Sequence, residues 1–256
     1  MAFVATPLAP AAALPPAHAK AVSAPCRPMI IEGDARFRRL MGAAAWRRLK
    51  PAVRRRFAER LATGESVVYV GQIAETQMNL AGRLLVQAAR LIGAPFPLEP
   101  EARGEAAVVA LTADNGSDGQ YWTRLYAWRR GFPQVVHSAK RFAGPTGLEE
   151  YVGCGVGVAL TLHEEDGGLR FRSAGYFLSI LGRRLPLPRF LSPGEMVIGH
   201  DDLGQGRFTF TLRLTHPWLG RLLHQVALFH DTAISAAETR EASPWPMLSP
   251  IPCSPL

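Results

Sequence analysis

The stretch Arg207-Phe-Thr-Phe-Thr-Leu-Arg-Leu-Thr215 alternates polar and apolar residues without a break. Every second residue from Phe208 to Leu214 therefore falls on one face of an extended chain, because successive strand residues point to opposite faces. The same alternation recurs from Phe171 to Phe229. This part of the chain is predicted to form a sheet with one apolar face and one solvated face.

Turn-forming residues divide the chain after residue 105 into further strands. Asp114-Asn-Gly116, Asp166-Gly-Gly168 and Gly204-Gln-Gly206 are such turns, and links this short join antiparallel neighbours. Leu185–Pro193 is expected to be a longer, irregular crossing. The strands are expected at 106–113, 120–130, 133–141, 148–162, 169–180, 194–202, 206–216 and 221–230.

The residues before 105 are predicted to supply helices. Apolar residues recur every three or four positions over 35–61, which favours two short helices divided at Pro51. A strand is expected at 66–74 and a helix at 77–92. The predicted fold is α+β: a large curved antiparallel sheet, a cup or partial barrel, with the N-terminal helices packed on it. Such a cup can hold one small ligand.

Length and composition fit a single globular domain, expected over 34–231. The chain has 256 residues, of which 48% are hydrophobic and 20% charged. Residues 1–33 are rich in Ala and Pro and residues 232–256 in Pro, which predicts a disordered leader and tail. The N-terminus lacks an early basic residue, which disfavours a secretory signal. Three widely spaced cysteines favour reduced thiols in a cytoplasmic protein, and no metal or cofactor is expected.

Short strings beyond this pattern carry a resemblance to a known family. Trp122-Thr-Arg124, Leu185-Pro-Leu-Pro188 and Gly206-Arg-Phe are the most specific of them. Over residues 37–229 the chain resembles a bacterial domain-of-unknown-function family. Its members occur alone or fused C-terminal to saccharopine-dehydrogenase-like or epimerase-like NAD-binding domains. The resemblance implies a partner, an NAD-dependent reductase encoded nearby, and it carries over no catalytic residue.

The strand expected at 120–130 holds the main candidate binding site. At a period of two, three aromatic residues and one arginine share a face. An arginine can bind a carboxylate with two hydrogen bonds, and aromatic walls can hold an apolar body. The candidate ligand-binding residues are Trp122, Arg124, Tyr126 and Trp128, with His137 on the next expected strand.

A second interpretation of this strand needs no ligand. On an outer or edge strand, Arg124 would stack on its aromatic neighbours in water. If Arg124 is instead buried, it needs an acid, and Glu149, Glu150 or a ligand could supply one. Burial of Arg124 therefore distinguishes the two interpretations.

Residues 34–60 hold ten Lys or Arg residues and two acidic ones, a balance equal to the formal net charge of the whole chain, +8. Arginine-rich amphipathic helices contact anionic membranes or phosphate. The alternative is a solvated helix face whose apolar stripe covers the sheet. No motif for specific nucleic-acid binding accompanies the charge. The candidate membrane or anion contacts are Arg47, Arg48, Arg54, Arg55 and Arg56.

The remaining polar strings favour structure over chemistry. His200-Asp-Asp202 and His163–Asp166 are expected to be solvated where strands end or turn, and Cys154 is expected inside the sheet. No catalytic constellation is evident, which leaves open whether the protein is an enzyme. The predicted function is a binding module for a small apolar or anionic-lipid-like molecule. The alternatives are an accessory domain or partner of an NAD-dependent reductase or epimerase, and a membrane-peripheral protein acting through the arginine-rich helices.

Overall fold

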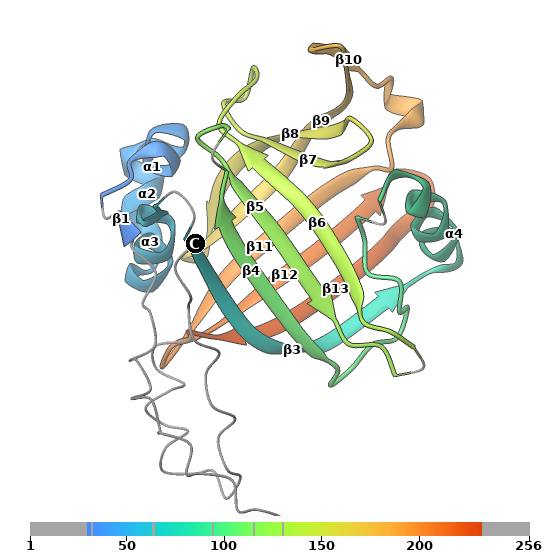
Figure 1. Ribbon diagram of the computed structural model, residues 1–256, viewed down its shortest axis with the longest axis horizontal. Helices are drawn as coiled ribbons and strands as arrows, with labels where there is room; N and C mark the ends of the chain where they lie inside the picture. Colours follow the sequence, from blue (N-terminus) through green and yellow to red (C-terminus); the bar gives the residue numbers. More distant parts are fainter. Residues whose placement is uncertain are drawn as a thin grey trace, which may run out of the picture. The chain divides into compact units, whose positions relative to one another are not determined.

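The computed structural model describes residues 30–31, 33–62, 65–93, 95–114, 116–129 and 131–231. Within this part of the chain, ten antiparallel strands close into a barrel (Figure 1). The barrel strands are β3 (Ser66–Met78), β4 (Ala106–Ala113), β5 (Gln120–Tyr126), β6 (Gln134–Arg141), β7 (Glu149–Gly153), β8 (Val156–Glu165), β9 (Gly168–Ile180), β11 (Glu195–Gly204), β12 (Arg207–His216) and β13 (Gly220–His230).

The sheet closes further than the predicted cup or partial barrel. Each barrel strand pairs with the next one along the chain, and β13 pairs back onto β3 from Leu223–Met78 to His230–Val70. This last pairing joins the two ends of the meander. The predominantly antiparallel β architecture is confirmed, and the cup or partial barrel of the prediction is a closed barrel.

The alternation in β12 has the expected consequence. Phe208 and Leu214 are fully buried, whereas Arg207 and Arg213 are exposed. Phe210 and Leu212 lie between the two buried positions and line the barrel interior. The period of two in the sequence therefore separates an interior face from a solvated one.

Several predicted boundaries are wrong for local reasons. The strand expected at 148–162 is the hairpin β7–β8, because Cys154 and Gly155 adopt φ angles of 45° and 76° and turn the chain. Cys154 is consequently exposed on this turn and not inside the sheet. The segment expected to be an irregular crossing contains the short strand β10 (Arg183–Pro186), paired with β9, and the 3₁₀ helix η2 (Arg189–Leu191).

The helical regions also differ from the prediction. Three helices replace the expected two, because Gly42 at φ 80° interrupts the first: α1 (Arg36–Met41), α2 (Ala43–Arg48) and α3 (Pro51–Ala58). The strand expected at 66–74 continues to Met78. Asn79 then caps α4 (Leu80–Ala88) by accepting a hydrogen bond from the Gly82 amide at 2.8 Å, and η1 (Ala89–Ile92) follows.

The helices lie at the two ends of the barrel (Figure 1). At one, the Lys50 amide donates to the Gly167 carbonyl in the β8–β9 turn, and the Phe37 and Phe57 rings contact Phe171. We call this the α1–α3 end. At the other, the Asn79 side chain donates to the Leu219 carbonyl in the β12–β13 turn. Because alternate turns of an up-and-down barrel lie at the same end, this α4 end also carries the turns that follow β5, β7 and β9.

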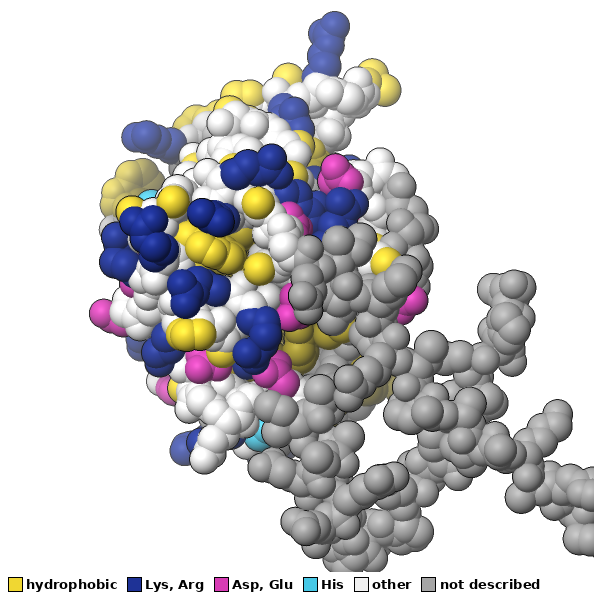
Figure 2. Space-filling model, turned by 90° about the vertical axis from the view of Figure 1, so that its left-hand side faces the viewer, with side chains coloured by type: hydrophobic (Ala, Val, Ile, Leu, Met, Phe, Trp, Pro, Cys, Tyr) yellow, Lys and Arg dark blue, Asp and Glu magenta, His cyan; other side chains and the backbone are white. Residues whose placement is uncertain are grey.

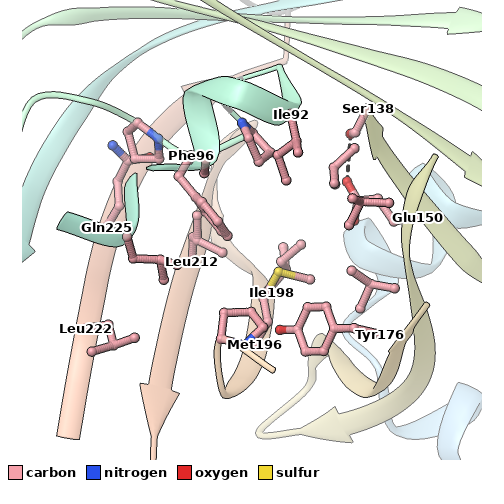
Figure 3. A pocket seen from close by; sticks show the side chains of 18 of the residues that line it. Ile92, Phe96, Ser138, Glu150, Tyr176, Met196, Ile198, Leu212, Leu222 and Gln225 are labelled. Atoms are coloured by element: carbon pink, nitrogen blue, oxygen red, sulfur yellow. Dashed lines mark hydrogen bonds between the residues drawn. The ribbon is translucent and has the colours of Figure 1, made fainter. Parts of the chain in front are cut away.

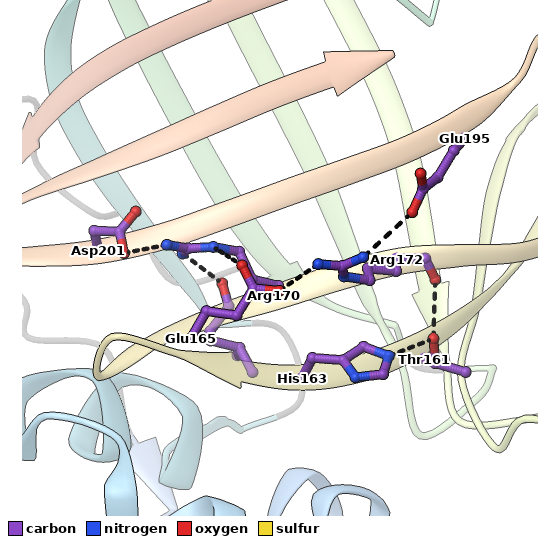
Figure 4. Close-up of polar contacts among 8 residues, drawn as sticks. Thr161, His163, Glu165, Arg170, Arg172, Glu195 and Asp201 are labelled. Carbon is purple, nitrogen blue, oxygen red and sulfur yellow. Dashed lines mark hydrogen bonds and ion pairs between the residues drawn. The ribbon is translucent and has the colours of Figure 1, made fainter. Parts of the chain in front are cut away.

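The pairing of β9 with β11 is short, and ion pairs reinforce it. Leu169–Arg172 pair with Val197–His200, after which β9 leaves β11 and pairs with β10. Arg170 reaches Asp201 on β11 at 2.8 Å and Arg172 reaches Glu195 at 3.4 Å; Figure 4 shows both contacts. Both arginines also contact Glu165 of β8, so that these side chains link three neighbouring strands.

The predicted leader, 1–33, and tail, 232–256, lie almost entirely outside the described residues. Within the leader, β1 (Ile30–Ile31) pairs with β2 (Arg60–Leu61).

Candidate ligand site inside the barrel

The barrel interior contains a cavity of about 580 Å³. Protein interiors are normally close-packed, with few voids larger than a water molecule, so a space of this size is not a packing defect. Figure 3 shows side chains from several strands and from the α4 region directed into it. Most of the lining is apolar, including Ile92, Phe96, Met196, Ile198 and Leu212.

One wall of the cavity carries a cluster of charged groups on three adjacent strands. Arg124 on β5 approaches the Glu150 carboxylate on β7 at 3.2 Å, and Lys140 on β6 approaches it at 3.0 Å. The Ser138 hydroxyl donates to the same carboxylate at 2.7 Å. Lys140 and Glu150 are directly opposite in the β6–β7 register, so the pairing of the strands itself brings them together.

The cluster is withdrawn from bulk solvent. The side chains of Lys140 and Glu150 are each 4% exposed, and that of Arg124 is 17% exposed. The Lys140 ammonium also lies 4.3 Å from the centre of the Trp122 ring. Burial distinguishes this arrangement from the alternative of an arginine stacked in water, and Glu150 is the acid that a buried Arg124 requires.

The electrostatics of the cluster favour a carboxylate at Glu150. Burial raises the pKa of Glu150, but the cations of Lys140 and Arg124 and the hydrogen bonds from Ser138 and Lys140 together lower it by more, to about 2. Burial lowers the pKa of Lys140, and Glu150 only partly offsets this effect. The carboxylate at 3.0 Å and the Trp122 ring favour the ammonium form. With Lys140 protonated, two cations face one anion, and the wall has an excess positive charge.

Three of the predicted ligand-binding residues line the cavity together: Trp122, Arg124 and Tyr126. The Trp122 indole N–H is buried without a hydrogen-bond partner among the described residues. Trp128 lies past the end of β5, is 40% exposed and is not among the cavity-lining residues. His137 is exposed on the outer face, where it contacts the Thr123 hydroxyl. The structure therefore separates these last two from the other three.

Sequence reasoning did not identify Lys140 or Ser138 as residues of the ligand site. A lysine in a strand is normally assumed to face solvent. The sequence did contain a signal, the alternation along the strand. Lys140 lies two residues after Ser138 and four residues after Val136, and Val136 is buried. A strand that directs Val136 inward must direct Lys140 inward as well.

The α4 region covers one end of the cavity. Ala81, Leu85 and Ile92 contribute to the lining, as expected of a covering helix. The helix lies close against the barrel because Gly82 has no side chain; a Cβ atom there would be 1.9 Å from the Leu222 carbonyl oxygen. Two lining residues at this end, Leu191 and Leu219, are more than half exposed. The cavity therefore reaches solvent beside α4.

The predicted membrane contacts lie at the α1–α3 end, where Figure 2 shows many Lys and Arg side chains and fewer acidic ones. Arg47, Arg54 and Arg55 are partly or well exposed, and Arg48 pairs with Glu164 at 2.6 Å. Arg56 differs: its side chain is 7% exposed and pairs with Asp202 and Asp231. It therefore holds the fold together and is not available to a membrane. No helix of the described residues is long and apolar enough to cross a bilayer.

The two histidine strings differ: His200–Asp202 lies within β11, whereas His163–Glu165 ends β8 and Asp166 lies in the turn that follows, as expected. His200 is 1% exposed, and its ring stacks on Phe208. Burial, with help from Arg56 and Arg170, lowers its pKa to about 3. His163 is exposed near the end of β8. Among the described residues no group of three His, Cys, Asp or Glu side chains could hold a metal ion.

Comparison with known proteins identifies the family. None of the curated proteins searched matches the chain. The family model described as "Domain of unknown function (DUF4166)" matches residues 49–229, which include all ten barrel strands except the last residue of β13. The match bears out the resemblance to a domain-of-unknown-function family. The chain belongs to this family, DUF4166.

Proposed function

We propose that this protein binds one small, mainly apolar molecule with an anionic end group, such as a long-chain carboxylate, inside the barrel. The observation that carries the proposal is the cavity of about 580 Å³ with a charged cluster on an otherwise apolar wall. Its volume lies within the range of roughly 300–1,000 Å³ usual for small-molecule sites.

The cluster supports an anion for reasons of charge and of hydrogen bonding. Arg124 and Lys140 share one carboxylate, and so retain donor capacity toward a second anion. The unpartnered Trp122 indole N–H adds a neutral donor beside them. A buried excess cation is costly, and a ligand carboxylate would reduce that cost.

The test compares ligands that differ only at their polar end. Palmitate and palmityl alcohol are titrated into the protein by calorimetry, and melting temperatures are recorded with each. We expect palmitate to bind more tightly and to raise the melting temperature. Arg124→Met should weaken palmitate binding by about tenfold or more, since a charge-assisted hydrogen bond contributes roughly 1.5–3 kcal/mol, and should leave palmityl alcohol almost unaffected.

Arg213→Met is the matched control, because Arg213 is exposed on the outer face of β12. Leu212→Trp offers a second test that does not depend on charge, since an indole at this lining position would fill the cavity. It should abolish binding of both ligands in a folded protein. Failure of palmitate and palmityl alcohol alike to bind the unmodified protein would refute the proposal.

The expected partnership with an NAD-dependent reductase remains a prediction that rests on the family resemblance alone. Co-purification with a reductase encoded nearby is its test.

A further inference from the structure

We infer that the α4 end of the barrel docks on an anionic lipid bilayer, so that the cavity opens toward the membrane. The inference rests on the proposed function, because it names the source of the apolar ligand. It is carried by a pattern that three separate segments repeat around the opening of the cavity.

Each of these segments places an exposed apolar side chain next to one that lines the cavity. Leu91 precedes Ile92 in η1, Phe190 precedes Leu191 in η2, and Trp218 precedes Leu219 in the β12–β13 turn. Leu91, Phe190 and Trp218 are 86%, 72% and 81% exposed. Because Ile92, Leu191 and Leu219 border one cavity, the three exposed side chains surround one opening.

The exposed apolar residues of the barrel are concentrated at this end. Leu80 and Leu84 lie on α4, and Leu181 and Phe132 lie on the turns that follow β9 and β5. With Leu91, Phe190 and Trp218 they are the seven most exposed large hydrophobic side chains of the described residues, from 65% for Leu84 to 99% for Leu181. The most exposed large apolar side chains are therefore gathered at one end of the barrel and not scattered over its surface.

The same segments carry positive charge. Arg90 precedes Leu91, Arg189 precedes Phe190, and Arg221 follows Leu219 after one residue. All three are exposed, and none forms an ion pair within the described part of the chain; Arg90 and Arg221 contact the neutral side chains of Gln87 and Gln77. Arginines beside exposed apolar side chains complement an anionic membrane surface.

Two features favour a bilayer over a protein partner. The apolar side chains project from separate turns and short helices around an opening, and do not form one continuous face. Trp218 has the amphipathic ring that favours the membrane–water interface. An opening that faces the membrane would also let a lipid-like ligand pass between bilayer and cavity without crossing water.

The test is co-sedimentation of the full chain with two kinds of vesicle: phosphatidylcholine alone, and phosphatidylcholine mixed with phosphatidylglycerol. We expect binding to the mixed vesicles. The triple variant Leu91→Ser/Phe190→Ser/Trp218→Ser should weaken it by about tenfold or more. Arg90→Gln/Arg189→Gln/Arg221→Gln should reduce binding to the mixed vesicles to the level seen with phosphatidylcholine.

Matched variants change the same kinds of side chain elsewhere. Val68→Ser/Val70→Ser/Leu203→Ser removes exposed apolar side chains away from the opening. Arg38→Gln/Arg39→Gln/Arg47→Gln removes exposed charges at the α1–α3 end. Both should bind the mixed vesicles like the unmodified protein. If only the Arg38→Gln/Arg39→Gln/Arg47→Gln variant loses binding, the membrane surface is the α1–α3 end and the inference is wrong.

Three further outcomes separate this inference from the proposed function. If the protein binds palmitate in solution but sediments with neither vesicle, the docking inference fails and the proposed function stands. If the protein sediments with mixed vesicles, and the α4-end variants lose this binding, but it binds no palmitate, the docking inference stands and the proposed function fails. If the serine variant leaves vesicle binding unchanged and instead converts a dimer to a monomer, the surface belongs to a second copy of the chain, which overturns the inference.

Discussion

His200 illustrates how a single side chain can decide the pH dependence of the fold. It lies between Phe57, Phe208 and Phe210, with all three rings within about 5 Å of the imidazole centre. An imidazolium in this aromatic environment, near Arg56, would be strongly disfavoured, which is why the pKa falls to about 3. The residue that was expected to be solvated is instead a neutral core group.

Loss of His200 should therefore change how stability depends on pH. Between about pH 6.5 and 3 the unfolded chain takes up a proton at this residue that the folded chain excludes. The pKa is lowered in the folded state, so the free energy of unfolding should fall as the pH drops below 6.5, by up to about 1.4 kcal/mol per pH unit. His200→Phe should remove this contribution. Urea unfolding between pH 7 and 5 measures this contribution to the free energy of unfolding, because that interval lies above the ordinary pKa values of carboxyl groups.

His137→Gln is the control for the His200 experiment, because His137 is exposed on the outer face. His224, whose pKa burial also lowers, remains in every variant, so the slopes are compared between variants and not with zero. Equal slopes for the unmodified protein and His200→Phe would show that the imidazole is solvated.

At the scale of single residues, part of the candidate site can be predicted from the sequence. The period of two in β5 placed Trp122, Arg124 and Tyr126 on one face, and that face lines the cavity. Trp128 was misplaced because β5 ends at Tyr126 and the period ends with it. Lys140 could not be weighed without knowing that Glu150 lies opposite it, since a lysine alone on a strand favours solvent.

At the level of elements, the position of α4 depends on the absence of a side chain. The backbone of the helix approaches β13 at Gly82, where a Cβ atom would overlap the Leu222 carbonyl. In an isolated helix, alanine is preferred to glycine by about 1 kcal/mol. Helix propensity and packing therefore predict effects of opposite sign for the same substitution.

Gly82→Ala should destabilise the protein by about 1–3 kcal/mol, because overpacking outweighs helix propensity. It should also displace α4 from the barrel, with faster amide exchange in Leu80–Ala88. Urea unfolding and hydrogen exchange measure the two effects. Arg83→Ala, on the exposed side of the same helix, should change neither by much. A Gly82→Ala variant more stable than the unmodified protein would contradict the close approach of helix and strand.

At the scale of the whole molecule, local sequence predicts the strands but not the closure of the barrel. Alternation and short turns each act over a few residues, and they account for the antiparallel meander. The pairing of β13 with β3 joins segments from opposite ends of the domain, and no local pattern encodes it. The hollow interior is a further property of the closed ring, since it depends on side chains from β5, β6, β9, β11 and β12 together.

Closure also depends on the short contact between β9 and β11. Arg170→Met removes the link from β9 to Asp201 and Glu165, and we expect a loss of about 1 kcal/mol, the upper range for a partly exposed ion pair. The loss should shrink at high salt, and amides of Leu169–Arg172 should exchange faster. Arg213→Met, on the neighbouring strand, should have no such effect. Identical exchange in the two variants would show that the ion pairs do not contribute to closure.

The short strand β10 has a consequence of its own. Each strand of the ring has neighbours on both sides, whereas β10 pairs with β9 alone. An unpaired strand border can recruit the same border of another molecule and start a polymer. Here Arg183 brings charge repulsion between copies, Arg184 is held by its ion pair with Glu149 at 2.9 Å, and Pro186 lacks the amide hydrogen that a recruited strand would need. Arg183 and Pro186 thus protect the protein from aggregating through this border.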